Sequence, residues 1–177
     1  MKKISFSLRL YLLLSFLLDP FYFVYQLISV LRGKENPKRF WERWVNKKIK
    51  RPSGKLIWLH AASVGETLSL LPLIEKILDD DPKVNILLTS TTKTSAEIYL
   101  KNSRNRVVHQ MAPHDTFFIS KRFIKYWRPD LAARVESEIW PRILIELKKN
   151  EIPNFLLNAR FSKKSISKIE SWALSCL

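Results

Sequence analysis

The sequence predicts an α/β fold in which helices flank a mostly parallel sheet, behind an apolar amino-terminal segment. From residue 55 onward, short β-rich runs alternate with longer helical stretches, which is typical of βαβ units. A length of 177 residues and a hydrophobic content of 46% allow one domain with a substantial core. With only three glycines, the chain has no glycine-rich phosphate loop.

An apolar stretch from Leu10 to Leu31 is the first expected element. Its 22 residues, rising about 1.5 Å each, are long enough to cross a hydrocarbon layer of about 30 Å. Asp19-Pro20 puts a charge and a helix breaker inside the stretch, which leaves open a second interpretation with two shorter interfacial helices. The aromatic cluster from Phe21 to Tyr25 is typical of a membrane interface. Both interpretations predict that residues 1–34 anchor the chain to a membrane and are not a removed signal peptide.

A basic juxtamembrane segment, residues 35–54, follows the apolar stretch. Between Arg32 and Lys55, ten Lys or Arg face two Asp or Glu, so this region carries +8 of the formal net charge of +15. Its position after an apolar stretch favours anionic membrane lipids over nucleic acid, for which no recognised motif is present. The positive-inside rule then predicts that the rest of the chain lies on the cytoplasmic face of the membrane.

The α/β pattern occupies residues 55–170 and leaves 171–177 as a tail. The single cysteine, Cys176, cannot form an internal disulfide, and the three histidines show no metal-ligand spacing, so no metal or cofactor is expected. The predicted strands are Leu56–Leu59, Asn85–Ser90, Val107–Met111, Leu131–Val135 and Asn154–Leu157. The predicted helices are Thr67–Asp80, Thr94–Lys101, Asp115–Trp127 and Ile139–Lys149.

Polar side chains follow every predicted strand. In open parallel sheets, ligands bind beyond the carboxyl ends of the strands, so these residues are candidates for one shared site. Carboxylates, hydroxyls and a guanidinium group suit a polyhydroxylated substrate with some negative charge. The candidates are His60, Ser63, Gly65, Glu66, Thr91, Thr92, Glu136, Glu138, Asn158 and Arg160, and His114 and Asp115 follow the third strand.

Glu66 lies where the first strand passes into a helix. Backbone N–H groups without partners and the positive end of the helix dipole favour its ionised form, which suits a general base. The run Ser63–Glu66 also matches a capping box, and local spacing alone favours that interpretation by about two to one. Gly65 would let a ligand approach the backbone closely. The similar run Thr94–Glu97 is interpreted as a helix cap alone.

Glu136 and Glu138 flank Ser137 at the end of the fourth strand. Because side chains two apart share one face of a strand, we expect the two carboxylates to point the same way. Glu136 is a candidate functional acid, and Glu138 is equally well explained as a charge at a helix start. Trp140-Pro141 is expected to fix that helix start through its proline.

Three further side chains have simple structural explanations. His60 orients a substrate hydroxyl, or it ends its strand with a hydrogen bond to the backbone, and general grounds favour the second explanation. Arg160 holds a phosphate or carboxylate, or is an exposed cation. His109 is expected to be satisfied in the core or at its edge, and we assign it no role.

Together these motifs resemble the 3-deoxy-D-manno-octulosonic acid (Kdo) transferases, which act on the lipid A precursor (lipid IVA) in lipopolysaccharide biosynthesis. The resemblance extends from the membrane-proximal segment to about Lys168. It rests on the runs His60–Glu66, Thr91–Thr94, Arg128–Asp130, Glu136–Pro141 and Asn158–Ser162.

The resemblance implies two Rossmann-like domains that face each other across a cleft, the glycosyltransferase B arrangement, with this chain as the acceptor-binding half. It implies that Glu66 is the general base, which deprotonates the acceptor hydroxyl as it attacks the anomeric carbon of CMP-Kdo, and that Glu136 assists the transition state. The implied transfer inverts the anomeric centre without a metal ion. Cations between Arg32 and Lys55 would hold the acceptor phosphates and anionic membrane lipids.

Two features depart from the family pattern. The sequence ends soon after the fifth strand, so we expect the donor-binding half to be absent. Two interpretations follow: the chain is one piece of a split enzyme whose donor half is on a separate chain, or it is a remnant of the whole enzyme. Ala132-Ala133-Arg134 puts a charge in a strand that should be buried, which is costly unless the charge is paired. A non-catalytic module that binds anionic lipid at the membrane is therefore the alternative function.

Overall fold

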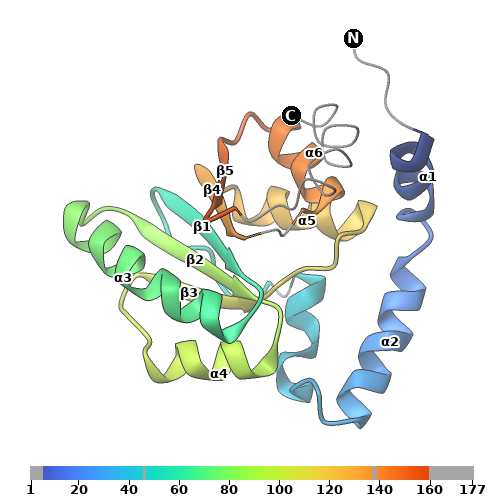
Figure 1. Cartoon of the computed structure of the whole chain (residues 1–177), viewed down its shortest axis with the longest axis horizontal. Helices are drawn as coiled ribbons and strands as arrows, with labels where there is room; N and C mark the ends of the chain where they lie inside the picture. The colour runs from blue at the N-terminus through green and yellow to red at the C-terminus, as the bar shows by residue number, and fades with distance from the viewer. Residues whose placement is uncertain (1–5, 46, 137–138, 160–177) are drawn as a thin grey trace.

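Five parallel strands form one sheet in the order β3-β2-β1-β4-β5 (Figure 1). A computed structural model describes residues 6–45, 47–136 and 139–159. This strand order matches that of Rossmann-type sheets, and the predicted α/β fold with a parallel sheet is confirmed. The strands are β1 (Leu56–Ala61), β2 (Asn85–Ser90), β3 (Val107–Met111), β4 (Leu131–Val135) and β5 (Asn154–Leu157).

Helices cover both faces of the sheet (Figure 1). The helices that lead from β1 to β2 and from β2 to β3 pack on one face, and the helices that follow β3 and β4 pack on the other. Short crossovers of this kind bring parallel strands side by side. The four helices are α3 (Val64–Asp80), α4 (Lys93–Lys101), α5 (Phe117–Trp127) and α6 (Pro141–Lys149).

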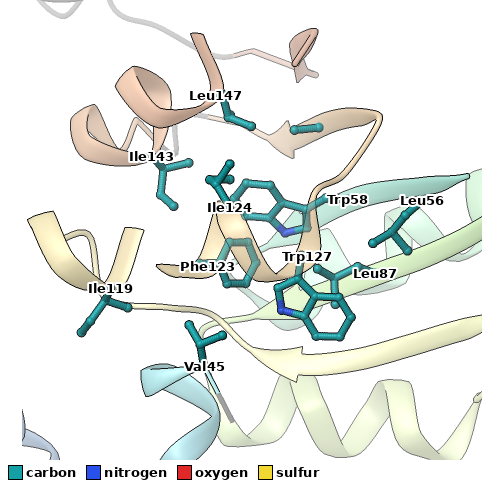
Figure 2. Close-up of a cluster of buried hydrophobic side chains, with 11 residues drawn as sticks. Val45, Leu56, Trp58, Leu87, Ile119, Phe123, Ile124, Trp127, Ile143 and Leu147 are labelled. Carbon is teal, nitrogen blue, oxygen red and sulfur yellow. The ribbon is translucent and has the colours of Figure 1, made fainter. Parts of the chain in front are cut away.

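Large aromatic side chains fill the layer between the sheet and helices α5 and α6 (Figure 2). Trp58 from β1 meets Phe123 from α5 at a ring-centroid distance of 4.8 Å, and both side chains are fully buried. The indole N–H groups still find partners, since Trp58 Nε1 donates to Thr89 Oγ1 at 2.9 Å. The layer under α3 and α4 is mainly aliphatic, with Leu59, Ile74, Ile86 and Leu88 at its centre.

Two helices and a 3₁₀ segment precede the sheet: α1 (Phe6–Leu14), α2 (Asp19–Leu31) and η1 (Pro37–Trp44). Helix α2 begins at Asp19 with Pro20 in its first turn, so the apolar stretch is divided where the second interpretation placed the break. The two helices are bent by 72°. Within the described residues, neither helix alone has the length and apolar content to cross a membrane, although the bent pair together does.

Part of the basic segment folds inward against the sheet. Arg39 Nη2 lies 2.6 Å from Glu42 Oε2 and 2.6 Å from His109 Nδ1. His109 is therefore satisfied at the edge of the core, as predicted. Arg51 Nε donates to the Trp127 carbonyl at 2.6 Å. These arginines maintain the fold, so the expectation that the whole basic segment faces ligands needs correction.

The strands lie almost where the sequence places them, but helix starts differ. β1 continues to Ala61, and α3 begins at Val64 because Ser63 is its N-cap. The predicted cap at Thr94 is wrong, since Thr92 caps α4 by accepting from Ser95 N at 3.2 Å. Helices α5 and α6 each begin two residues later than expected. Pro141 lies in the first turn of α6, as predicted, and is the residue at which the helix begins.

Candidate functional site

The carboxyl ends of the strands bring the predicted site residues to one edge of the sheet. The chain runs from β1 outward to β3 and then returns to β4 on the other side of β1. β1 and β4 therefore flank a topological switch point, where open α/β sheets form their ligand crevice. Glu66 follows β1 and Glu136 follows β4, so the two candidate catalytic carboxylates lie on either side of this point.

Glu66 is held at the start of α3 by a cap. Ser63 Oγ accepts from Glu66 N at 3.3 Å, and Glu66 Oε2 accepts from Ala62 N at 2.8 Å. The capping interpretation is thus confirmed, with Ala62 in place of Ser63 as the second donor. The side chain remains half-buried, and its Oε1 makes no hydrogen bond within the described residues. The space over Gly65 is open, because an added Cβ would meet no atom within 4 Å.

Glu136 adopts a left-handed backbone conformation, with φ of 59°. Such a conformation costs a non-glycine residue on the order of 1–3 kcal/mol and is typical of functional sites. Its N–H donates to Leu157 O at 2.8 Å, which holds the residue in line with β5. The half-buried side chain makes no hydrogen bond or ion pair with the described residues. Asn158 after β5 is exposed and also left-handed, with φ of 50°, which asparagine tolerates well.

Thr91 and Thr92 line the same edge after β2. Thr91 is exposed, and its carbonyl accepts from Arg43 Nη2 at 2.6 Å. The Thr92 hydroxyl lies 2.6 Å from Ser95 Oγ and caps α4. Thr91 therefore offers a hydroxyl to a ligand, whereas the hydroxyl of Thr92 already serves the helix.

His60 lies beneath the edge and has no access to solvent. Its Nδ1 is 2.9 Å from Thr89 Oγ1, and its ring contacts Trp140 at a centroid distance of 4.4 Å. Burial, together with the charge of Arg134 in the neighbouring strand, lowers the pKa of His60 to about 3. The neutral ring is held in the core by the hydroxyl of Thr89, where the structural explanation expected a backbone partner. Arg134 is buried and donates to Asn154 Oδ1 at 3.2 Å, so its charge in β4 has a polar partner.

Asp115 organises the edge beside β3, a role that the sequence did not reveal. Its carboxylate accepts from Tyr11 Oη at 2.6 Å, from Ile143 N at 2.8 Å and from Arg142 N at 3.1 Å. By accepting from these two backbone N–H groups, Asp115 caps the start of α6 from another loop. The N-cap residue of α6, Trp140, makes no side-chain cap bond. Burial raises the pKa of Asp115, while these donors lower it in part.

Two predicted residues, Glu138 and Arg160, lie outside the described residues. Within the described ranges, no group of three or more His, Cys, Asp or Glu side chains could hold a metal ion. The remaining candidates of the site are carboxylates, hydroxyls and amides, which can deprotonate a hydroxyl or hold a sugar through hydrogen bonds.

Comparisons with known proteins connect this geometry to one family. The family model for 3-deoxy-D-manno-octulosonic-acid transferase (kdotransferase) matches residues 38–175. A 3-deoxy-D-manno-octulosonic acid transferase of Rickettsia bellii is 42% identical over 165 residues, which is 93% of this chain and 38% of that protein. A probable mitochondrial 3-deoxy-D-manno-octulosonic acid transferase of Arabidopsis thaliana is 35% identical over 97% of this chain and 38% of that protein.

A more distant relative shows the same pattern of coverage. A 3-deoxy-D-manno-octulosonic acid transferase of Haemophilus influenzae is 35% identical over 64% of this chain and 27% of that protein. The chain thus spans about two fifths of the length of the first two relatives and less of the third. The family match and the relatives together show that this chain belongs to the Kdo transferase family.

Proposed function

We propose that this chain supplies the acceptor side of Kdo transfer from CMP-Kdo to a lipid A precursor. The observation that supports the proposal most strongly is the placement of Glu66 and Glu136 on either side of the switch point in a member of this family. In this proposal the edge of the sheet faces a second Rossmann-like domain in a glycosyltransferase B arrangement. In our proposal, this second domain lies on a separate chain and binds the donor.

In the proposed mechanism, Glu66 Oε1 takes the proton from the attacking acceptor hydroxyl. The hydroxyl oxygen forms a bond to the anomeric carbon from one side while the bond to the CMP phosphate breaks on the other. CMP leaves with the electron pair, and the anomeric centre inverts. The Ala62 N–H holds Oε2, which fixes the carboxylate and leaves Oε1 for the proton.

The remaining edge residues are proposed to bind the acceptor sugar. Glu136 stabilises charge that develops in the transition state, and its strained backbone aims it from the end of β4. Ser63, Thr91 and Asn158 are exposed at the edge and offer hydrogen bonds to sugar hydroxyls. Gly65 leaves room for the ligand to approach the backbone, and Arg160 and Glu138 complete the site in our proposal.

The amino-terminal helices are proposed to hold the chain at the cytoplasmic face of a bacterial inner membrane. Between Leu10 and Leu31, eleven large apolar side chains are exposed, which favours contact with lipid. Exposed cations of the basic segment, Lys38 and Lys50 among them, can then meet anionic lipid and acceptor phosphates.

A transfer assay with matched glutamate variants tests the proposal. The chain is co-expressed with the part of the Rickettsia bellii relative that lies beyond the matched region, and radiolabelled CMP-Kdo is supplied with detergent-dispersed lipid IVA. Glu66→Gln should lower the transfer rate by about 10² or more, because the base is lost while the side-chain shape remains. Glu97→Gln, an exposed glutamate on α4, serves as control. Equal rates for the two variants would remove Glu66 as the base.

The cap bond of Glu66 favours a second candidate, a non-catalytic module that binds lipid A precursor at the membrane. In that case the carboxylate serves only the helix. Titration with lipid IVA, followed by the transfer assay, separates the two functions. Saturable binding without turnover in the presence of the donor-binding part would support the module.

A further inference from the structure

A groove with a basic lining lies along α5 beside Lys47 and shares no lining residue with the candidate site described above. Its volume is about 430 Å³, and no carboxylate is among the described residues that line it. Four cations and two aromatic rings form its walls. They are Lys47, Phe118, Lys121, Arg122, Lys125 and Tyr126.

Hydrogen bonds hold the two walls of this basic groove together. The Tyr126 hydroxyl donates to Ile49 O at 2.7 Å and lies 3.3 Å from Lys47 O. Arg51 ties the same segment to the end of α5 through the Trp127 carbonyl. These bonds keep Lys47 beside a helix face that carries charges of the same sign.

No carboxylate of the described residues neutralises the cations of the basic groove. Lys121 and Lys125 are spaced i, i+4 on α5, where like charges repel each other. None of the four cations makes an ion pair with a described residue. Lys121 Nζ instead lies 6.0 Å from the centroid of the Phe117 ring. Such a cluster attracts an anion.

The open end of the basic groove is apolar. Phe118 is 49% exposed, and its ring lies 4.9 Å from that of Phe16, which is 47% exposed. Leu13 and Leu17, on either side of Phe16 in the sequence, are 68% and 61% exposed. The cationic pocket therefore continues into the exposed apolar surface of α1 and the turn after it.

We propose that the basic groove binds the phosphate of a membrane lipid headgroup, with the acyl chains directed toward Phe118 and Phe16. Lysine and arginine side chains pair with phosphate oxygens through charge-assisted hydrogen bonds, and the adjoining apolar surface suits hydrocarbon. This site deepens the proposed membrane location and rests on it, but it uses residues separate from Glu66 and Glu136. It would fix the orientation of the chain on the bilayer.

Vesicle flotation with matched lysine pairs tests the basic groove. The vesicles contain phosphatidylcholine with or without phosphatidic acid. Lys121→Gln/Lys125→Gln should weaken binding to phosphatidic acid vesicles by about tenfold, since each lysine near an anionic surface contributes strongly. Lys83→Gln/Lys101→Gln removes the same charge from exposed positions at β2 and the end of α4 and should change binding about twofold or less. Equal losses for the two pairs would overturn the proposal.

A second pair of measurements separates a lipid phosphate from a free phosphate. Phe118→Ser should weaken binding to phosphatidic acid vesicles, because the lip of the groove loses its apolar contact. Inorganic phosphate at about 10 mM should leave most of the chain on the vesicles, because multiple lipid contacts act together. Complete displacement by inorganic phosphate would show that the groove takes the free ion and would overturn the lipid assignment.

These outcomes are distinguishable from failure of the proposed function. Glu66→Gln should abolish transfer and leave vesicle binding unchanged. The groove variant should keep its transfer rate on detergent-dispersed lipid IVA. If the unsubstituted chain fails to float with any vesicle, the membrane location itself is wrong, and the groove proposal falls with it.

Discussion

The layer under α5 and α6 and the helix α2 bury opposite kinds of side chain. Under α5 and α6, the largest fully buried side chains are Trp58 and Trp127. Across α2 and the turn before it, the buried side chains are Ser15, Gln26 and Ser29, and most of the large apolar side chains are exposed. Apolar side chains fill the interior of the first region, whereas in the second region most of them face outward.

The two regions also differ in how they are held. Apolar burial in the sheet is non-directional and depends on the area removed from water. Helix α2 and the turn before it are held by directional bonds as well as by ring contacts. Arg142 Nε donates to Ser15 Oγ at 2.5 Å and Trp44 Nε1 donates to Gln26 Oε1 at 2.6 Å, while the Phe23 ring meets the Phe40 ring at a centroid distance of 5.5 Å. The outward apolar face is then left for another environment, which is the basis of the membrane proposal.

Trp58→Ala should have the largest effect on stability. Truncation of a fully buried tryptophan opens a cavity beside Phe123 and should lower the free energy of unfolding by about 4 kcal/mol. Urea unfolding followed by circular dichroism measures the loss. Trp41→Ala, at an exposed position on η1, should change it by about 0.5 kcal/mol or less. Similar losses at both positions would break the comparison.

Asp115→Ala should have a smaller and more local effect. The half-buried donors Arg142 N and Ile143 N would lose their acceptor, and Tyr11 Oη would keep only the backbone carbonyl of residue 115, at a cost of about 3 kcal/mol. Hydrogen exchange should rise in α1 and in the first turn of α6 and stay low in β1 and β2. Asp79→Ala, at an exposed position on α3, is the control. Faster exchange spread evenly over the sheet would contradict a separate polar attachment.

His114→Phe should have the smallest effect, and one that depends on pH. His114 stacks on Tyr22 of α2, and burial lowers its pKa to about 3, with Arg43 adding to the shift. A histidine with a lowered pKa stabilises the fold above its unfolded pKa of about 6.5 and loses that contribution as the pH falls toward 3.

The size of the effect follows from the unfolded pKa of histidine. Between pH 7 and pH 5, protonation of this histidine in the unfolded state should lower the free energy of unfolding of the unsubstituted protein by about 2 kcal/mol more than that of the phenylalanine variant. His60 and His109, whose pKa values are also lowered to about 3, and Asp115, whose raised pKa acts in the opposite direction, are present in both proteins, so their contributions cancel in the difference. Urea unfolding at the two pH values measures this. A parallel decline of both proteins would show that His114 is not buried in its neutral form.

The sheet was predictable because each strand is specified by the residues within it and next to it. Four of the five strands match their predicted bounds, from Asn85–Ser90 to Asn154–Leu157, since runs of β-branched and leucine residues bounded by polar ones specify a strand without help from distant residues. The parallel order then follows from the alternation with helices. For the same reason, Glu66 and Glu136 could be placed at one edge from the sequence alone.

The attachment of the amino-terminal helices was not predictable because it depends on distant partners. Tyr11 and Asp115 are 104 positions apart, and neither lies in a local pattern that reveals the other. Arg43 is one of the ten cations between Arg32 and Lys55, yet it is buried against carbonyls of two other loops. A count of charges cannot separate an arginine that holds the fold from a lysine that faces solvent.

Arg43 also carries a mechanical consequence. Its guanidinium group joins Glu35, just beyond α2, to the Ala112 and Thr91 carbonyls on the loops after β3 and β2. A displacement of α2 is therefore transmitted through Arg43 to the loops that carry Thr91 and Ala112, without passing through the sheet. If α2 rests on a bilayer as we propose, its depth in the bilayer and the position of the loops proposed to bind sugar change together.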